Sequence, residues 1–228
     1  MVDTLLWDID DTLLNFHKSE EWAIRTSLNE LAEKEIDDEA LSRYRTINHS
    51  YWKKLELGEI EKKDLLWMRF RDFFEAEGIK ADPKEFNGMY QSRLGDRVFP
   101  NDDGVNLCLK LKGRFKQYAV SNGTKIAQYK KLKLSGLDEI FDGIFISEEV
   151  GFEKPRKEFF DYVFSQIGEE KRATSLMIGD SLTSDMRGGN NAEITCLWYN
   201  PKRDVNESDV LIDYEISNLW DIEKIVSN

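Results

Sequence analysis

The chain has 228 residues, of which 40% are hydrophobic and 12% aromatic. This composition supports a packed core and excludes a disordered chain, and the length fits one large domain or a domain with an insertion. The 44 acidic and 32 basic residues give a net charge of −12. A nucleic-acid polymer would meet net repulsion, so we do not expect one as a partner.

The two cysteines, Cys108 and Cys196, stand among apolar neighbours. We therefore expect buried free thiols and no disulfide. No stretch approaches the roughly 20 apolar residues of a membrane span, and the N-terminus has no signal-like region. These features predict a cytoplasmic protein without a membrane partner.

A short apolar run at 4–7 predicts a first strand, and a long helical region follows it. Apolar residues at steps of three and four predict successive amphipathic helices between about 17 and 92. Asp82-Pro83 has the pattern of an N-cap followed by proline at the first helical position. We interpret 15–94 as a helical bundle with its own small core.

From about residue 95, short apolar runs alternate with helical segments. Strands separated by helices predict parallel pairing, and the run at 4–7 must join this sheet because an isolated strand is not stable. The expected fold class is therefore α/β, a Rossmann-like three-layer core (1–14 and 95–228) with an inserted α-helical bundle (15–94). The expected strands are 4–7, 117–121, 143–146, 175–178, 194–198 and 209–212, and the expected helices are 125–134, 156–167, 185–191 and 219–226.

Polar residues follow the expected strands, at the sheet edge where open parallel α/β sheets bind ligands. These residues are Asp8, Asp10, Ser121, Asn122, Lys154, Asp180 and Asp185. Clustered carboxylates are costly unless a cation compensates their charge. The pattern therefore predicts one site that combines carboxylates, a hydroxyl, an ammonium and a bound cation.

Each motif taken alone has an ordinary structural explanation. An Asp-x-Asp pair is common in turns, where the side chains bond their own backbone. Ser121-Asn122-Gly123 fits a strand-to-helix turn with an N-cap, and Lys154 before a proline fits a solvated lysine ahead of a helix. The placement of all of them at one sheet edge is what favours a functional site.

Four segments together resemble the motifs of the haloacid dehalogenase superfamily. Residues 7–13, Trp-Asp-Ile-Asp-Asp-Thr-Leu, resemble the first motif, and Ser121 at a strand end resembles the second. Lys154-Pro155 resembles the third motif, and the Gly-Asp-Ser-Leu-x-x-Asp sequence at 179–185 resembles the fourth. The four occur in the expected order, and the likeness covers essentially the whole chain.

The insertion resembles the C1 cap of that superfamily. The interval from Ser121 to Lys154 is too short for the alternative second cap. Within the insertion, Gly58-Glu59-Ile60 together with Leu65-Leu66-Trp67 is similar to the corresponding segments of the YjjG-like nucleotidase branch.

The resemblance implies a magnesium-dependent phosphomonoester hydrolase that works through an aspartyl-phosphate. Asp8 would be the nucleophile, and Asp10 would protonate the leaving oxygen and later activate water. Mg²⁺ would take the carboxylates of Asp8 and Asp180 and the backbone carbonyl of Asp10. Asp185 would lie outside the metal and orient a bound water or Lys154.

Phosphate binding is implied for Asp8, Ser121, Asn122 and Lys154, which would hold or neutralise the phosphoryl oxygens. The expected substrate is a small phosphorylated metabolite, with a nucleoside 5′-monophosphate favoured. A sugar phosphomutase of the same superfamily and a phospho-aspartyl signalling module that does not turn over remain as alternatives. A haloacid dehalogenase is disfavoured by Asp10, because dehalogenation needs no acid there. The sequence leaves the oligomeric state open.

Overall fold

The computed structural model describes residues 2–226, which divide into two compact units. The segments up to Phe16 and from Val98 onward form one unit, and His17–Arg97 form the other. The insertion expected at 15–94 overlaps this second unit, with both ends displaced by no more than three residues. The first unit therefore combines the beginning of the chain with its second half.

The first unit is built on a six-stranded parallel sheet with the strand order β3-β2-β1-β4-β5-β6. β1 lies between β2 and β4, and Trp7 at its end pairs with Ala119 and Ile178. The α/β fold class predicted from the sequence is confirmed. The strands are β1 (Thr4–Trp7), β2 (Lys116–Ser121), β3 (Gly143–Ile146), β4 (Ser175–Gly179), β5 (Thr195–Tyr199) and β6 (Tyr214–Ile216).

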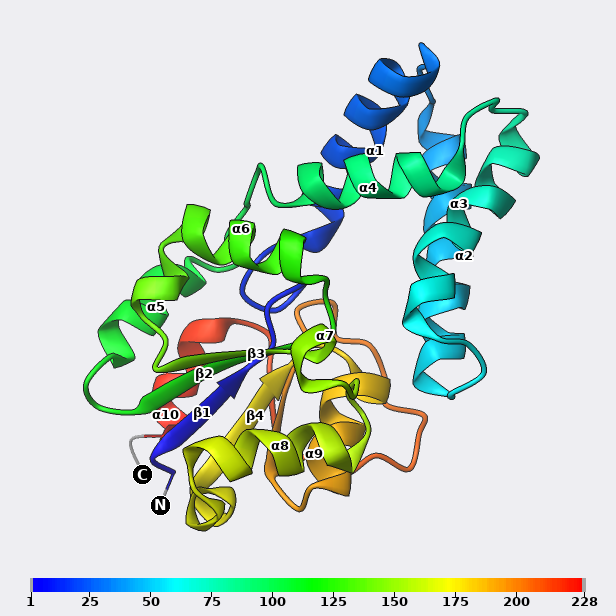
Figure 1. Ribbon diagram of the computed structural model, residues 1–228. Helices are drawn as coiled ribbons and strands as arrows, with labels where there is room; N and C mark the ends of the chain where they lie inside the picture. The colour runs from blue at the N-terminus through cyan, green and yellow to red at the C-terminus, as the bar shows by residue number, and fades with distance from the viewer. Residues whose placement is uncertain (1, 227–228) are drawn as a thin grey trace. The chain divides into compact units, whose positions relative to one another are not determined.

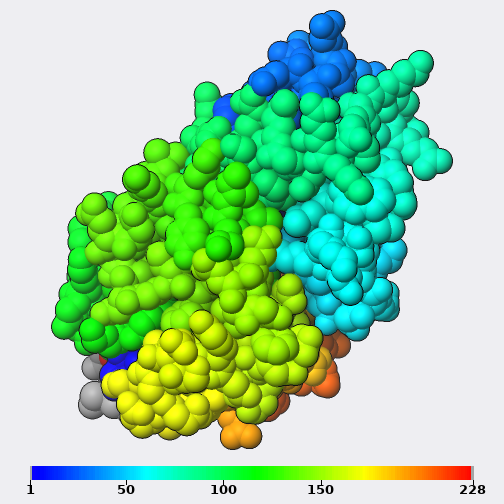
Figure 2. All heavy atoms as spheres, viewed as in Figure 1, coloured from blue at the N-terminus to red at the C-terminus, as the bar shows by residue number. Residues whose placement is uncertain are grey.

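Helices cover both faces of this sheet, because alternate residues of a strand point to opposite faces (Figure 1). Leu5 and Trp7 on β1 pack in one apolar cluster with residues of α5, α6 and α10. Leu6 packs in a second cluster with residues of α8 and the turn before α9. In Figure 2 the green atoms of α6 and the yellow atoms of α8 lie on the surface that faces the viewer. The helices of this unit are α5 (Gly104–Leu111), α6 (Lys125–Ser135), α7 (Ser147–Val150), α8 (Lys157–Ile167), α9 (Arg187–Asn191) and α10 (Ile222–Val226).

The second unit contains helices around an aromatic core. Tyr44 stacks on Phe70 with ring centroids 5.5 Å apart, and Phe70 also contacts the ring of Phe86 edge-to-face. The predicted cap at Asp82 is confirmed, because its Oδ1 accepts hydrogen bonds from the backbone of the first turn of α4. The helices are α1 (Phe16–Ala32), α2 (Asp38–Glu56), α3 (Lys62–Glu77) and α4 (Pro83–Leu94).

The expected strand at 209–212 is wrong, and the edge strand is β6 instead. The side chain of Asn190 accepts a hydrogen bond from the N–H of Leu211 and donates one to its carbonyl. These backbone groups are therefore unavailable for a strand ladder. The helix expected at 185–191 begins earlier, as a π-helical turn η3 (Leu182–Met186) that leads into α9. The closing helix at 219–226 begins as a 3₁₀ turn η4 (Leu219–Asp221).

Both cysteines are buried and free, as predicted. Burial raises the pKa of the Cys196 thiol to about 12, so this thiol stays protonated at neutral pH. Among residues 2–226, no helix is both long enough and apolar enough to cross a membrane.

The first prediction concerns Leu6, which is fully buried in the central strand. Leu6→Ala should lower the free energy of unfolding by about 2–5 kcal/mol, because it removes buried methyl groups and leaves a cavity. Urea denaturation measures this change. Leu109→Ala is the control, since this side chain on α5 is 55% exposed and should change stability little. Equal effects of the two substitutions would contradict the central position of β1.

Candidate active site

Asp8 follows directly after β1, and its position is set by the sheet. Its N–H donates to the carbonyl of Ile178, with an N–O distance of 2.9 Å, which extends the pairing of β1 with β4 by one residue. The chain then turns sharply, with Asp11 in the left-handed region at φ 63°. Asn101 donates to the carbonyls of Asp11 and Thr12 and fixes this turn. Asp8 is thereby held at the carboxyl edge of the sheet, where its side chain is largely buried.

Lys154 is the central cation of the site. Its ammonium donates to Asp8 Oδ1 at 2.8 Å, to Asp185 Oδ1 at 2.6 Å and to the carbonyl of Val120 at 2.8 Å. Its side chain is 1% exposed. Burial by itself acts to lower the pKa of Lys154, but Asp185 and Asp8 more than offset that effect and raise it above its ordinary value. Lys154 therefore stays charged within the protein.

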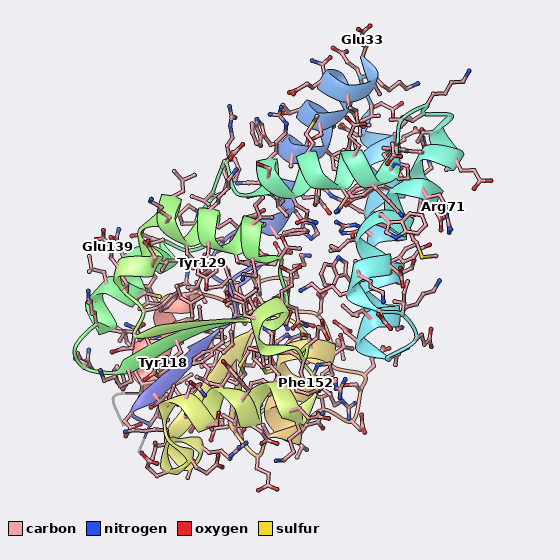
Figure 3. The ribbon with its side chains drawn as sticks, in the orientation of Figure 1. Glu33, Arg71, Tyr118, Tyr129, Glu139 and Phe152 are labelled. Carbon is pink, nitrogen blue, oxygen red and sulfur yellow. The ribbon has the colours of Figure 1, made fainter. Side chains whose placement is uncertain are left out.

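The loop that carries Lys154 is fixed by Asn122. The Asn122 amide donates to the carbonyl of Lys154 and accepts from its N–H, with both distances at 2.8 Å. Phe152, labelled in Figure 3, belongs to the same loop, and the Arg156 guanidinium lies over its ring. The side chain of Asn122 thus positions Lys154. The sequence analysis did not predict this contact.

Asp180 and Asp185 come from the segment that follows β4. Asp185 lies in the η3 turn, and its Oδ2 accepts from the N–H of Ser181 at 3.1 Å. Glycine at 179 makes this possible, because a Cβ there would lie 2.3 Å from Asp185 Oδ2. Both oxygens of Asp185 are therefore used, one by Ser181 and one by Lys154.

The carboxylates of Asp8, Asp180 and Asp185 each place an oxygen within 4.8 Å of the other two. Burial, and then the Asp185 carboxylate, raise the pKa of Asp8 to about 7 although Lys154 acts in the opposite direction. Burial, and then Asp8, raise the pKa of Asp180 well above its ordinary value. Three carboxylates against one ammonium leave an excess of negative charge, and a divalent cation would compensate it. Hard oxygen donors of this kind suit Mg²⁺, so the residues fit such an ion.

The Asp10 carboxylate contacts two side chains of α6. Its Oδ1 accepts from the ammonium of Lys131 at 2.5 Å, and its Oδ2 accepts from the amide of Gln128 at 2.6 Å. The two aspartates of the first motif therefore have separate partners from different elements. Asp8 pairs with Lys154, and Asp10 pairs with Lys131.

Ser121 closes β2, directly after Val120, whose carbonyl accepts from Lys154. Its hydroxyl oxygen accepts from the N–H of Gly123 at 3.0 Å, so the hydroxyl hydrogen can be donated elsewhere. The structure thus brings Asp8, Lys154, Asp180 and Asp185 into direct contact or close proximity. Asp10, Ser121 and Asn122 border that cluster through their neighbours in the chain.

Comparison with known proteins agrees with this geometry. The sequence profile of the haloacid dehalogenase-like hydrolases matches residues 2–193. The chain belongs to this family. The predicted family membership is confirmed, and the protein is a hydrolase.

Relatives within the family include two named nucleotidases. The chain is 36% identical over 220 residues to pyrimidine 5′-nucleotidase PynA of Streptococcus pneumoniae, covering 96% of this chain and 92% of PynA. It is 29% identical over 227 residues to pyrimidine 5′-nucleotidase YjjG of Escherichia coli, covering 98% and 97%. Both matches agree with the predicted similarity to the YjjG-like branch.

The Bacillus subtilis protein YfnB is similar in both sequence and structure. It is 35% identical over 224 residues, covering 98% of this chain and 95% of YfnB. A crystal structure of YfnB bound to magnesium superposes with a TM-score of 0.93 and covers 100% of this chain and 99% of that one. The fold of this hydrolase is therefore that of its relatives over its full described length.

Three residues of the site carried no role in the sequence analysis: Thr12, Gln128 and Lys131. The Thr12 hydroxyl lies 3.1 Å from Asp8 Oδ2 and 3.2 Å from Asp180 Oδ1, so it joins the two carboxylates. The position of Thr12 within the first motif could have indicated this contact with the carboxylates. Gln128 and Lys131 are three positions apart on an expected helix, which places them on one face. The sequence held no signal that this face meets Asp10.

The second prediction concerns the buried charge of Lys154. Lys154→Met should lower the free energy of unfolding by about 3–5 kcal/mol in metal-free buffer, because it leaves buried carboxylates without their partner. Urea denaturation measures the loss. Lys157→Met is the matched control, since Lys157 is 52% exposed and pairs with Asp161 on the surface of α8. If the two variants unfold at the same urea concentration, Lys154 does not neutralise the cluster.

Proposed function

We propose that this hydrolase is a Mg²⁺-dependent phosphomonoesterase that forms an aspartyl-phosphate on Asp8. The observation that carries the proposal is the group of three clustered carboxylates, two of which are buried and paired with one lysine. This group needs a cation for charge balance, and it borders hydrogen-bond donors suited to a phosphoryl group. The cytoplasmic location stays a prediction from the sequence.

The proposed roles in phosphoryl transfer are those that the family resemblance implies, and the contacts of Asp8 support them. Asp8 would attack phosphorus with a carboxylate oxygen, and the bond from phosphorus to the leaving oxygen would break as Asp10 donates a proton to that oxygen. Asp10, then a carboxylate, would take a proton from water as the water oxygen attacks phosphorus. The bond between phosphorus and Asp8 would break, which releases inorganic phosphate and restores Asp8. Two half-reactions thus need one nucleophile and one group that changes its protonation state.

The remaining residues would bind and neutralise charge. Lys154 would offset the charge of Asp8 and of a phosphoryl oxygen, while Ser121 and the backbone at Asn122 would donate to the other phosphoryl oxygens. Asp8 and Asp180, with the backbone carbonyl of Asp10, would hold Mg²⁺, which supplies neutralisation of the phosphate charge when bound. Both oxygens of Asp185 are occupied by protein donors, which supports a place outside the metal for this residue.

The favoured substrate is a nucleoside 5′-monophosphate. The names of PynA and YjjG support a pyrimidine nucleotide, and other relatives of this chain are named glyceraldehyde 3-phosphate phosphatases. All of these are small phosphorylated molecules. We further propose that the helical unit His17–Arg97 serves as a C1-type cap that selects among them.

A phosphate-release screen over nucleoside monophosphates and sugar phosphates, with Mg²⁺ and with EDTA, tests the function. We expect repeated turnover without a bisphosphate activator, loss of activity in EDTA and recovery on adding Mg²⁺. Asp8→Asn should reduce turnover by at least roughly 10³-fold while the protein stays folded. Activity retained in that variant would refute the nucleophile. A single turnover without release would favour the signalling module, and a need for a bisphosphate would favour the mutase.

The metal site can be tested without activity. Mg²⁺ at about 100 times its Kd should raise the melting temperature of the parent by about 5–10 °C, through about 2.7 kcal/mol of binding free energy. Asp180→Asn should abolish this rise, and without metal it should be at least as stable as the parent because one of three clustered carboxylates is gone. Asp138→Asn, at an exposed residue, is the control and should respond like the parent. A normal Mg²⁺ response in Asp180→Asn would exclude Asp180 as a ligand.

A further inference from the structure

Helix α6 contributes two side chains that bind Asp10 at once. The Lys131 ammonium contacts Asp10 Oδ1 at 2.5 Å, and the Gln128 amide contacts Oδ2 at 2.6 Å. Lys131 is 1% exposed, whereas the Asp10 side chain is 24% exposed. The contact therefore fixes a partly accessible carboxylate against a fully buried cation.

We propose that Lys131 and Gln128 form an α6 clamp, a pair of positioning residues that orient the Asp10 carboxylate for proton transfer in the proposed phosphatase reaction. One donor on each oxygen fixes the plane of a carboxylate. Each oxygen keeps a further lone pair, because an ionised carboxylate offers about four acceptor sites. The clamped group can therefore still face a leaving oxygen or a water.

Core packing alone does not explain the buried polar side chains of the clamp, because apolar side chains at these positions would fill the space at a lower free-energy cost. An apolar side chain at 131 would avoid burying an ammonium, and burying a charge is unfavourable unless it is closely paired. Lys131 instead lies between Asp10 and the ring of Phe16, whose centroid is 5.1 Å from its Nζ. The Oε1 atom of Gln128 is buried and accepts no hydrogen bond within the described part of the chain. An unpaired buried acceptor lowers stability, so the amide is better explained by its contact with Asp10.

The turn after β2 leaves space for the Gln128 amide because residue 123 is a glycine. A Cβ at Gly123 would lie 2.1 Å from Gln128 Nε2, so any other residue there would displace the amide. Tyr129, labelled in Figure 3, is the next residue on α6 and lies on its exposed side, where its hydroxyl donates to Glu149. The clamp thus occupies one face of α6 only.

Two substrates whose leaving groups differ in their need for a proton can distinguish a loss of Asp10 orientation from a general distortion of the site. An alkoxide is a poor leaving group and needs a proton from Asp10, whereas p-nitrophenolate leaves without one. A loss of Asp10 orientation should therefore slow phosphoryl transfer from an alkyl phosphate and spare transfer from p-nitrophenyl phosphate. A general distortion of the site would slow both.

The test compares single-turnover rates of leaving-group release, with enzyme in excess and Mg²⁺ present, for uridine 5′-monophosphate and p-nitrophenyl phosphate. We expect Lys131→Met to slow uridine release by about 10–100-fold and to change p-nitrophenolate release by less than about twofold. Gln128→Leu should act in the same direction with a smaller effect. Lys131→Arg should restore part of the loss because it keeps the cation.

Two comparisons connect the effect to Asp10. Asp10→Asn should show the same selectivity, and the double variant Asp10→Asn/Lys131→Met should be no slower than Asp10→Asn within about threefold, since both changes remove one function. Lys133→Met is the matched control, because Lys133 lies on the exposed side of α6, and it should resemble the parent. Additive losses in the double variant, or equal losses on both substrates, would overturn the proposal.

The positioning role of Lys131 and Gln128 can be refuted while the proposed phosphatase function stands. If the parent hydrolyses phosphate esters but Lys131→Met and Gln128→Leu keep the parent's ratio of the two rates, the clamp has no positioning role and the function stands. If the parent releases phosphate from neither substrate, both proposals fall. A double-mutant cycle of Asp10→Asn and Lys131→Met in urea unfolding then still reports whether the two side chains interact.

Discussion

The charge balance around Lys154 is the constraint on which the rest of the active site depends. One buried ammonium donates to two carboxylates and to a backbone carbonyl, and a third carboxylate lies within 4.8 Å of those two without contacting the lysine. A folded chain tolerates this arrangement only when the excess negative charge is neutralised by protonation or by a cation. The raised pKa of Asp8 and of Asp180 shows the first solution, and a divalent ion would supply the second.

The two aspartates of the first motif, two residues apart, have different partners. Asp8 continues the central strand and meets Lys154 from the loop before α8, whereas Asp10 lies beyond the strand and meets α6. Carboxylates in different environments can serve as nucleophile and as acid or base, because their partners set their charge and orientation. The sharp turn through Asp11, held by Asn101, is what separates them.

Membership of the haloacid dehalogenase-like hydrolases accounts for the fold and the hydrolytic type of reaction, and the substrate has to be argued from finer features. The relatives match this chain over nearly its whole length, and the match includes the helical unit as well as the sheet. The helical unit His17–Arg97 is a separate compact unit with its own aromatic core. The proposed role of the helical unit in substrate choice is consistent with this separation, because the candidate active-site residues belong to the other unit.

The sequence by itself determined the parallel α/β core, and it predicted the insertion and the polar residues at the strand ends, because short apolar runs and their adjacent polar residues are local patterns. It misplaced the last strand, because the side chain of Asn190 on α9 binds the backbone of Leu211, a contact that local patterns do not reveal. Only the tertiary structure decided that Gln128 and Lys131 face Asp10 and that Thr12 joins two carboxylates. Helical spacing tells which residues share a face, but the packing of that helix against the sheet decides what the face contacts.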